Sequence, residues 1–299
     1  MPLLDFDAAW RAYLAAGPRL PPAPPPVTPR RVGGVAEIAD RFDLIVLDAW
    51  GVLNLGDSVI PTAPDAVAQL RRRGKRLVVL SNDGGSDKAM TLAKHRRRGF
   101  DFAADELIAG LDLLPEALAA LPPVETLGLI ADDPLPLADL TGRMRRLGDR
   151  ATDYDDAEGF VLLSSDEWSE VRQGKLRASL ARRPRPLIVG NPDIVSPGPE
   201  AIYAEPGFYA HRLAAELDIA PLFLGKPYEA IYRRLALRHP DVAPDRVLCV
   251  GDTPQTDVLG GRNAGHRTLL VEDGFCRGRD AIALCRESGI WPDFIAERL

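Results

Sequence analysis

The sequence has few cysteines and few histidines. Its three cysteines, Cys249, Cys276 and Cys285, form no CxxC pair, so neither a disulfide framework nor a zinc site is predicted. The four histidines are scattered, and we expect them to have structural roles. No GxSxG elbow and no GxGxxG after a strand is present, which leaves a serine hydrolase and a dinucleotide oxidoreductase unsupported. This cysteine usage fits a reducing, cytoplasmic location.

Long apolar runs and a basic surplus are also missing. No window approaches the roughly 18 uninterrupted apolar residues that a membrane span requires, and the N-terminus has acids where a signal peptide would have basic residues. The 299 residues carry a formal net charge of −6, which argues against nucleic acid as a partner. We therefore predict a globular protein that binds neither membrane nor nucleic acid.

Short aliphatic runs alternate with helical periodicity in two parts of the chain. DLIVLD, PDAVAQLRRRG, KRLVVLSN and SDKAMTLAKHRRRG follow one another from residue 43, and the pattern returns from YEAIYRRLALRH to RTLLVED. This alternation predicts an α/β fold with a doubly wound parallel sheet. Residues 122–218 interrupt it, which predicts an inserted α/β domain. We expect a core of residues 41–121 and 219–299, preceded in residues 1–40 by a helix and a stiff proline-rich extension.

Polar residues follow the predicted strands at their carboxyl ends. Asp48 ends LIVLD, Ser81 and Asn82 end RLVVLSN, and Asp252 ends RVLCVGD, while FLGKP presents Lys226. In open parallel sheets, ligands bind beyond this edge, at the point where the strand order reverses. Each feature alone could be a turn or a helix cap. Their conjunction predicts one site.

The set of side chains suits phosphoryl transfer, which depends mainly on positioning and charge neutralisation. Asp48 is the predicted nucleophile, and it would form an aspartyl-phosphate. Two adjacent acids, Asp48 and Asp252, would repel each other without a hard cation, so Mg²⁺ is implied. Asp257 would support the metal or its waters. Ser81 and the amides after it would donate to phosphate oxygens, with Lys226 as a positive charge.

These residues resemble the four motifs of the haloacid dehalogenase (HAD) superfamily. The motifs are Asp48-x-x-Gly51-Val52, Ser81-Asn82, Gly225-Lys226-Pro227 and Gly251-Asp252-x4-Asp257. The insertion between the second and third motifs resembles the class IIA cap of nitrophenylphosphatase-like and pyridoxal-phosphate-phosphatase-like enzymes. GNPD at 190–193 and EPG at 205–207 are typical of that branch, although Asn191 and Asp193 could equally only fix the geometry of a cap loop.

The resemblance implies a Rossmann-like core, a cap and a Mg²⁺-dependent phosphatase acting on a small phosphorylated metabolite. It implies a catalytic role for Asp48, Lys226 and Ser81. The metal would be held by Asp48, Asp252 and the backbone carbonyl of Trp50, supported by Asp257. Substrate contacts are expected from Ser81, Asn82, Asp83 and Lys226. Residues 51–61 would form a flap, and a homodimer is possible by the same resemblance.

Trp50 departs from the usual pattern of the superfamily. Most of its phosphatases carry a second aspartate there, which protonates the leaving oxygen and later activates water; an indole can do neither. Losing this help typically lowers the rate by 10²- to 10⁴-fold. A class IIA subgroup shares the Asp-x-Trp-Gly-Val pattern, and Asp83 and Asp57 are candidate replacements. Two other interpretations stay open, namely a phosphate-ester-binding sensor or partner protein with little turnover, and a phosphotransferase.

Overall fold

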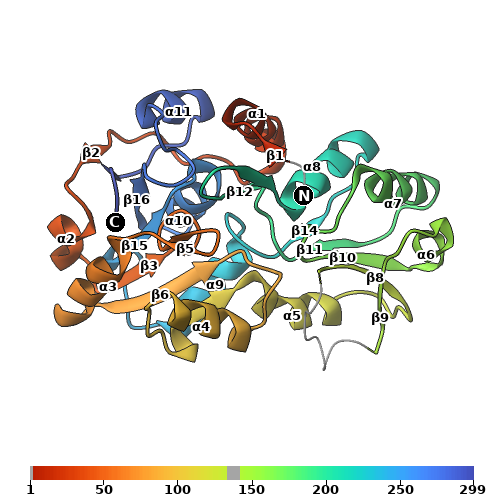
Figure 1. Cartoon of the computed structure of the whole chain (residues 1–299), viewed down its shortest axis with the longest axis horizontal. Helices are drawn as coiled ribbons and strands as arrows, with labels where there is room; N and C mark the ends of the chain where they lie inside the picture. The colour runs from red at the N-terminus through yellow and green to blue at the C-terminus, as the bar shows by residue number, and fades with distance from the viewer. Residues whose placement is uncertain (1–2, 133–141) are drawn as a thin grey trace.

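Two parallel sheets organise the chain in the computed structural model, which describes residues 3–132 and 142–299 (Figure 1). All strands of the larger sheet run parallel. In spatial order they are β2 (Arg30–Arg31), β17 (Phe294–Ala296), β16 (Arg267–Val271), β15 (Val247–Gly251), β3 (Leu44–Leu47), β6 (Arg76–Ser81) and β7 (Leu107–Ala109). The chain moves outward from β3 in one direction and from β15 in the other. The strand order therefore reverses between β3 and β15, and the predicted doubly wound α/β fold is confirmed.

Helices cover both faces of this sheet and explain its apolar strands. They are α2 (Val35–Ile38), α3 (Ala63–Arg72), α4 (Lys88–Arg97), α9 (Glu229–Arg238), α10 (Leu259–Asn263) and α11 (Ala281–Ser288). Alternate residues of β3 enter two different hydrophobic clusters, with Ile45 and Leu47 on one face and Leu44 and Val46 on the other. Because both faces are buried, a continuous aliphatic run is required rather than an alternating pattern. Cys249 is packed inside the second cluster.

The smaller sheet is built from the middle of the chain and is also parallel. Its strands, in spatial order, are β14 (Leu222–Phe223), β11 (Leu187–Val189), β10 (Gly159–Leu162), β8 (Leu127–Ile130) and β9 (Met144–Arg146). The helices of this part are α6 (Ala151–Asp156), α7 (Glu170–Arg182) and α8 (Pro206–Leu217). α5 (Leu114–Ala119) contributes Leu114 and Ala117 to a hydrophobic cluster that contains residues of both sheets. Large side chains such as Tyr154, Trp168 and Tyr209 fill its core.

The division into domains remains a prediction, and sheet membership refines one of its boundaries. β14 pairs with β11 of the smaller sheet, although its residues lie after the predicted boundary at 219. We therefore place the return to the core after Phe223. Residues 133–141, which the predicted cap includes, lie outside the described part of the chain.

The N-terminal segment forms a short strand and a helix, which contact residues from the parts of the chain around both sheets. β1 (Leu3–Leu4) pairs with β13 (Ile202–Ala204), which in turn pairs with β12 (Val195–Pro197). The predicted helix is α1 (Phe6–Ala16), with Asp5 as its N-cap. The proline-rich stretch lies against the core, because Arg262 and Asn263 donate hydrogen bonds to the carbonyl oxygens of Pro25 and Pro22. None of the described helices is long and apolar enough to cross a membrane.

Candidate active site

Three acids meet at the reversal point of the larger sheet. Asp48 follows β3 and Asp252 follows β15, while Asp257 lies in a turn of π-helix over Pro254–Val258. One carboxylate oxygen of each lies within 4.8 Å of the others. The Asp48 amide donates to the carbonyl oxygen of Val250 at 2.9 Å, which carries the β3–β15 pairing one residue further. The structure therefore brings the three predicted acids together at this edge of the sheet.

Lys226 lies among these acids as a buried counter-charge. Its Nζ is 2.6 Å from Asp48 Oδ1 and 2.7 Å from Asp257 Oδ1, and its side chain is 3% exposed. Burial acts to lower the pKa of Lys226, but the carboxylates of Asp257, Asp48 and Asp193 outweigh burial and raise it. The ammonium therefore stays charged. One ammonium against three carboxylates leaves two negative charges, the charge that a divalent cation neutralises.

The pKa values of two of these acids are raised, in part by the same excess of negative charge. Burial first, and then the charge of Asp257, raise the pKa of Asp252 to about 7. Burial and the neighbouring acids also raise the pKa of Asp48, although Lys226 opposes this. A buried all-oxygen donor set with surplus negative charge fits Mg²⁺, which prefers carboxylate oxygens. The residues present therefore suit the metal that the sequence predicts.

Asp252 is held rigidly from two sides. Thr253 Oγ1 donates to its Oδ1 at 2.8 Å, and the Phe275 amide donates to its Oδ2 at 2.7 Å. Gly51 lies against the same carboxylate with φ +81°, and a Cβ there would be 1.7 Å from Asp252 Oδ2. The glycine of the first motif is therefore required by both backbone conformation and space.

The residues after β6 form a turn and hold the backbone of Lys226. Ser81 is buried, and its Oγ accepts from the Asp83 amide at 3.1 Å. Asn82 donates from Nδ2 to Asp193 Oδ1 and to the Lys226 carbonyl oxygen, and its Oδ1 accepts from the Lys226 amide at 2.7 Å. Asp83 accepts from the Gly85 amide at 2.8 Å. Because the Asn82 amide is fully occupied, we propose that it positions Lys226 rather than contacting substrate.

Trp50 and the flap follow the nucleophile directly. The Trp50 side chain is half-buried and packs against the hydrophobic cluster that contains Ile45 and Leu47. The predicted flap contains a hairpin of β4 (Asn54–Leu55) and β5 (Ser58–Val59). Asp57, at its turn, is fully exposed and pairs with Arg98 at 3.2 Å. This exposure and pairing argue against Asp57 as the replacement acid. The hydrogen bond that the Asp83 carboxylate accepts within its own turn argues against Asp83 in the same role.

Asp193 is a site residue whose position the sequence did not reveal. It comes from the GNPD segment, 111 residues after Asn82 along the chain, yet the two side chains are 2.8 Å apart. Burial raises its pKa to about 6, although Lys226 acts in the opposite direction. The GNPD motif was the available indication, but no spacing rule joins it to the second motif. Asp193 is therefore an acid beside the catalytic cluster.

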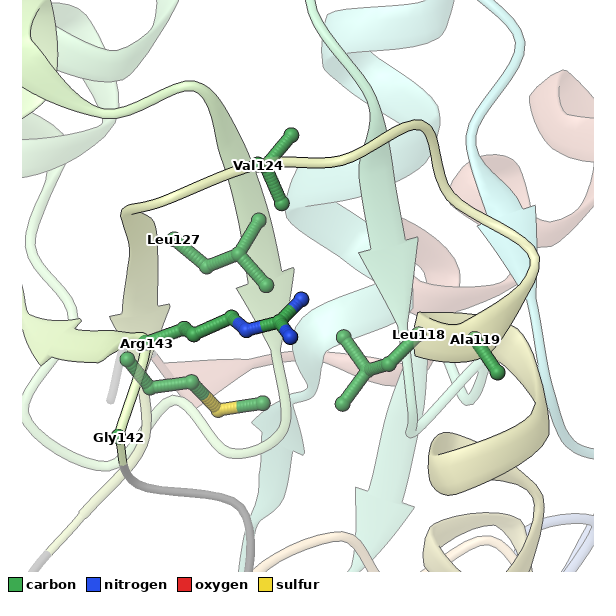
Figure 2. Close-up of a pocket in the computed structure, with 7 residues that line it drawn as sticks. Leu118, Ala119, Val124, Leu127, Gly142 and Arg143 are labelled. Atoms are coloured by element: carbon green, nitrogen blue, oxygen red, sulfur yellow. The ribbon is translucent and has the colours of Figure 1, made fainter.

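An apolar pocket elsewhere contains none of the predicted site residues. It has a volume of about 320 Å³ and lies between α5 and the strands β8 and β9. Figure 2 shows the Arg143 guanidinium between Leu127 and Leu118 in this pocket. None of the described residues that line it is acidic, so these residues offer no chemistry like that at the strand ends.

Family models match the two parts of the chain that carry the motifs. A haloacid dehalogenase-like hydrolase model matches residues 45–135, and a HAD-hydrolase-like model matches residues 223–299. The chain belongs to the haloacid dehalogenase superfamily. This confirms the predicted family and the prediction of a HAD-type hydrolase.

Several individual proteins resemble the chain over most of its length. Glycerol-3-phosphate phosphatase of Gallus gallus is 29% identical over 284 residues, covering 87% of this chain and 90% of that protein. A possible sugar phosphatase from Cytophaga hutchinsonii has a similar structure, with a TM-score of 0.78, 21% identity, and coverage of 91% of this chain and 98% of that one. Glycerol phosphate phosphatase from Mycobacterium tuberculosis, solved in complex with magnesium, has a TM-score of 0.62 at 18% identity, covering 88% and 81%.

Proposed function

We propose that this protein is a Mg²⁺-dependent phosphatase that acts on a small phosphorylated metabolite through an aspartyl-phosphate on Asp48. The observation that carries the proposal is the contact of Lys226 Nζ with both Asp48 and Asp257, beside Asp252, at the strand-order reversal. The names of two relatives, a glycerol-3-phosphate phosphatase and a possible sugar phosphatase, support this class of substrate.

Asp48, Asp252, the Trp50 backbone carbonyl and the supporting Asp257 are the residues proposed to hold the metal. Mg²⁺ bound there would supply positive charge to the phosphoryl oxygens and to the acids around them. The magnesium complex of the similarly folded mycobacterial protein supports this choice of ion.

Asp48 has one oxygen positioned by the protein and one left for attack. Its Oδ1 accepts from the Ala49 amide at 2.7 Å and contacts Lys226 at 2.6 Å. We infer that Oδ2 attacks phosphorus as the bond to the leaving oxygen breaks with its electron pair, giving phospho-Asp48 and an alkoxide or phenolate. Water then attacks the phosphorus, which releases inorganic phosphate and restores the Asp48 carboxylate. Lys226 and Ser81 would hold the phosphoryl oxygens during both transfers.

The proton for the leaving oxygen needs a source other than Trp50. An alkoxide must be protonated as it leaves, whereas a nitrophenolate leaves without a proton. The enzyme should therefore be relatively better with aryl than with alkyl phosphates, unless water or the substrate itself delivers the proton.

Hydrolysis of 4-nitrophenyl phosphate with and without Mg²⁺ tests the proposal. We expect the wild type to need Mg²⁺ and Asp48→Asn to lose turnover, because an amide is not a nucleophile. Asp57→Asn is the matched control, because Asp57 is fully exposed. Tight binding of a phosphate ester without turnover would favour the sensor interpretation. Faster phosphoryl transfer to an added alcohol than to water would favour a phosphotransferase.

Two broader expectations from the sequence stay predictions. A homodimer would be detected by sedimentation of the purified protein. A cytoplasmic location would be detected by fractionation of the producing cell, and neither is needed for the chemistry proposed at Asp48.

A further inference from the structure

Three aromatic side chains of the N-terminal segment that forms α1 lie around the ring of Phe275. The ring centroids of Phe6, Trp10 and Tyr13 lie 5.1, 6.5 and 5.5 Å from that of Phe275. Trp10 Nε1 also donates to Glu287 Oε2 at 2.7 Å, which fixes α1 on α11. These contacts come from a segment that precedes both matched family models.

Phe275 belongs to the loop that holds the acid at the end of β15. Its amide donates to Asp252 Oδ2 at 2.7 Å, and Cys276 Sγ lies 3.3 Å from the Asp252 carbonyl oxygen. The loop is packed tightly on this carboxylate, since a Cβ on Gly274 would be 2.3 Å from Asp252 Oδ2. A shift of the Phe275 ring would therefore move the amide that fixes Asp252.

The same N-terminal segment is tied to the other part of the molecule. β1 pairs with β13, and Ile194 and Val195 share a hydrophobic cluster with Tyr13 and Phe275. Figure 1 shows α1 between α11 of the larger-sheet part and α8 of the smaller-sheet part. Burial, followed by the negative charges of Asp193 and Asp252, raises the pKa of Tyr13, so its hydroxyl stays protonated near acids from both parts.

We propose that residues 3–16 form a clamp of the active site, in which Tyr13 and its aromatic neighbours position Asp252 for metal binding through the Phe275 loop. The inference rests on the metal site of the proposed function, but not on hydrolysis. Partners of metal ligands typically change metal affinity by about 10- to 100-fold when they are removed. Tyr13 is a positioning residue in this account, because it acts on the metal site through Phe275.

Mg²⁺ titration of the full-length protein without substrate, followed by calorimetry, tests the clamp. We expect Tyr13→Ala to weaken Mg²⁺ binding by about tenfold or more and to lose most of the Mg²⁺-induced rise in Tm. Tyr13→Phe keeps the ring against Phe275 and should bind Mg²⁺ like the wild type. Arg11→Ala is the control, because Arg11 is exposed on the same helix.

A surface variant keeps the test valid if Tyr13→Ala does not fold. Arg279 lies over the Phe6 ring at 4.2 Å and 3.7 Å from Asp7. Arg279→Ala should therefore loosen α1 and weaken Mg²⁺ binding without leaving a cavity.

The outcomes separate the clamp from the proposed function. Mg²⁺ affinities of Tyr13→Ala and Arg279→Ala equal to that of Arg11→Ala would overturn the clamp. A wild type that binds Mg²⁺ and depends on Tyr13, but hydrolyses no ester, would contradict only the phosphatase. A wild type that binds no Mg²⁺ would overturn the metal site and the clamp together.

Discussion

We propose that Trp50 limits the proton transfers that the site can perform. It lies two residues after the nucleophile, and its indole has no acidic or basic group with an accessible pKa. Trp50→Asp would restore a carboxyl at that position. We expect kcat/KM for glycerol 3-phosphate to rise by about 10²-fold relative to that for 4-nitrophenyl phosphate, because only the alkyl leaving group needs the proton.

Trp50→Asn is the matched control for that change. It removes the same contact with the hydrophobic cluster and introduces a side chain of the same size, but it cannot donate an acidic proton. For both variants, the ratio of kcat/KM for glycerol 3-phosphate to that for 4-nitrophenyl phosphate should be measured by steady-state kinetics at one pH. An equal ratio in Trp50→Asp and Trp50→Asn would mean that position 50 does not control the proton.

At this scale the sequence predicts the residues that end strands and misses those that meet through loops. Asp48 and Asp252 were predictable because the carboxyl ends of neighbouring parallel strands share one edge. The pairing of Asn82 with Asp193 was not, because it joins residues 111 positions apart through an irregular loop. The exposure of Asp57 likewise depends on a hairpin turn that no periodicity fixes.

The turn after β3 depends on Gly51. Gly51→Ala would place a Cβ 1.7 Å from Asp252 Oδ2 and so displace that carboxylate. We expect activity to fall by about 100-fold, in line with the loss of a group that orients metal ligands. Steady-state hydrolysis rates and unfolding free energies of the variant should both be measured.

Gly74→Ala separates this clash from backbone strain. Gly74 also has a positive φ, +68°, but a Cβ there meets nothing within 4 Å. Both variants should lose about 1–2 kcal/mol of stability from the left-handed conformation, while Gly74→Ala keeps full activity. Equal losses of activity in the two variants would contradict the role of Gly51.

Glu205, which follows β13 at the start of α8, is another buried acid with a raised pKa. Glu205 accepts hydrogen bonds from Asn191 Nδ2 and Ser196 Oγ, and burial raises its pKa from 4.5 to about 8. The folded protein therefore keeps this proton up to about pH 8, whereas the unfolded chain releases it near its ordinary value of 4.5. Stability from this group is complete below that ordinary value and is lost as the pH rises toward 8.

Glu205→Gln should remove this pH dependence. In urea unfolding across that window, the wild type should lose up to about 1.4 kcal/mol per pH unit from this group, and Glu205→Gln should not. Glu200→Gln, at an exposed position in the turn between β12 and β13, should behave like the wild type. A wild type whose stability rises with pH through the window would count against the shift at Glu205.

Element prediction succeeded where long apolar runs fill parallel strands and failed for very short strands. β3, β6 and β15 are bounded by turn residues and buried on both faces, so their sequences are unambiguous. β12 and β13 lie in a stretch rich in proline and glycine, and their pairing with each other and with β1 depends on tertiary contacts. Local propensity carries little information about such strands.

Asn82 connects three distant segments of the whole molecule. It joins the end of β6 to the backbone of Lys226 and to the Asp193 side chain. Asn82→Ala would leave these buried groups without partners, and we expect stability to fall by about 2 kcal/mol or more. Lys226 would lose its anchor, so activity should fall as well.

A surface amide provides the comparison for Asn82. Asn263→Ala removes one exposed hydrogen bond to the Pro22 carbonyl oxygen and should change stability by less than about 0.5 kcal/mol. Urea unfolding of both variants measures the difference. Equal unfolding free energies of Asn82→Ala and Asn263→Ala would contradict the role of Asn82 in holding the catalytic segments together.

A covalent phosphoryl group on Asp48 is the intermediate that distinguishes the proposed reaction. Rapid acid quenching during turnover of 4-nitrophenyl phosphate, followed by peptide mass spectrometry, measures it directly. We expect a phosphoryl group on the peptide that contains Asp48, dependent on Mg²⁺ and absent from Asp48→Asn. Phosphate release at full rate by Asp48→Asn, or a phosphoryl group on a different residue, would contradict it.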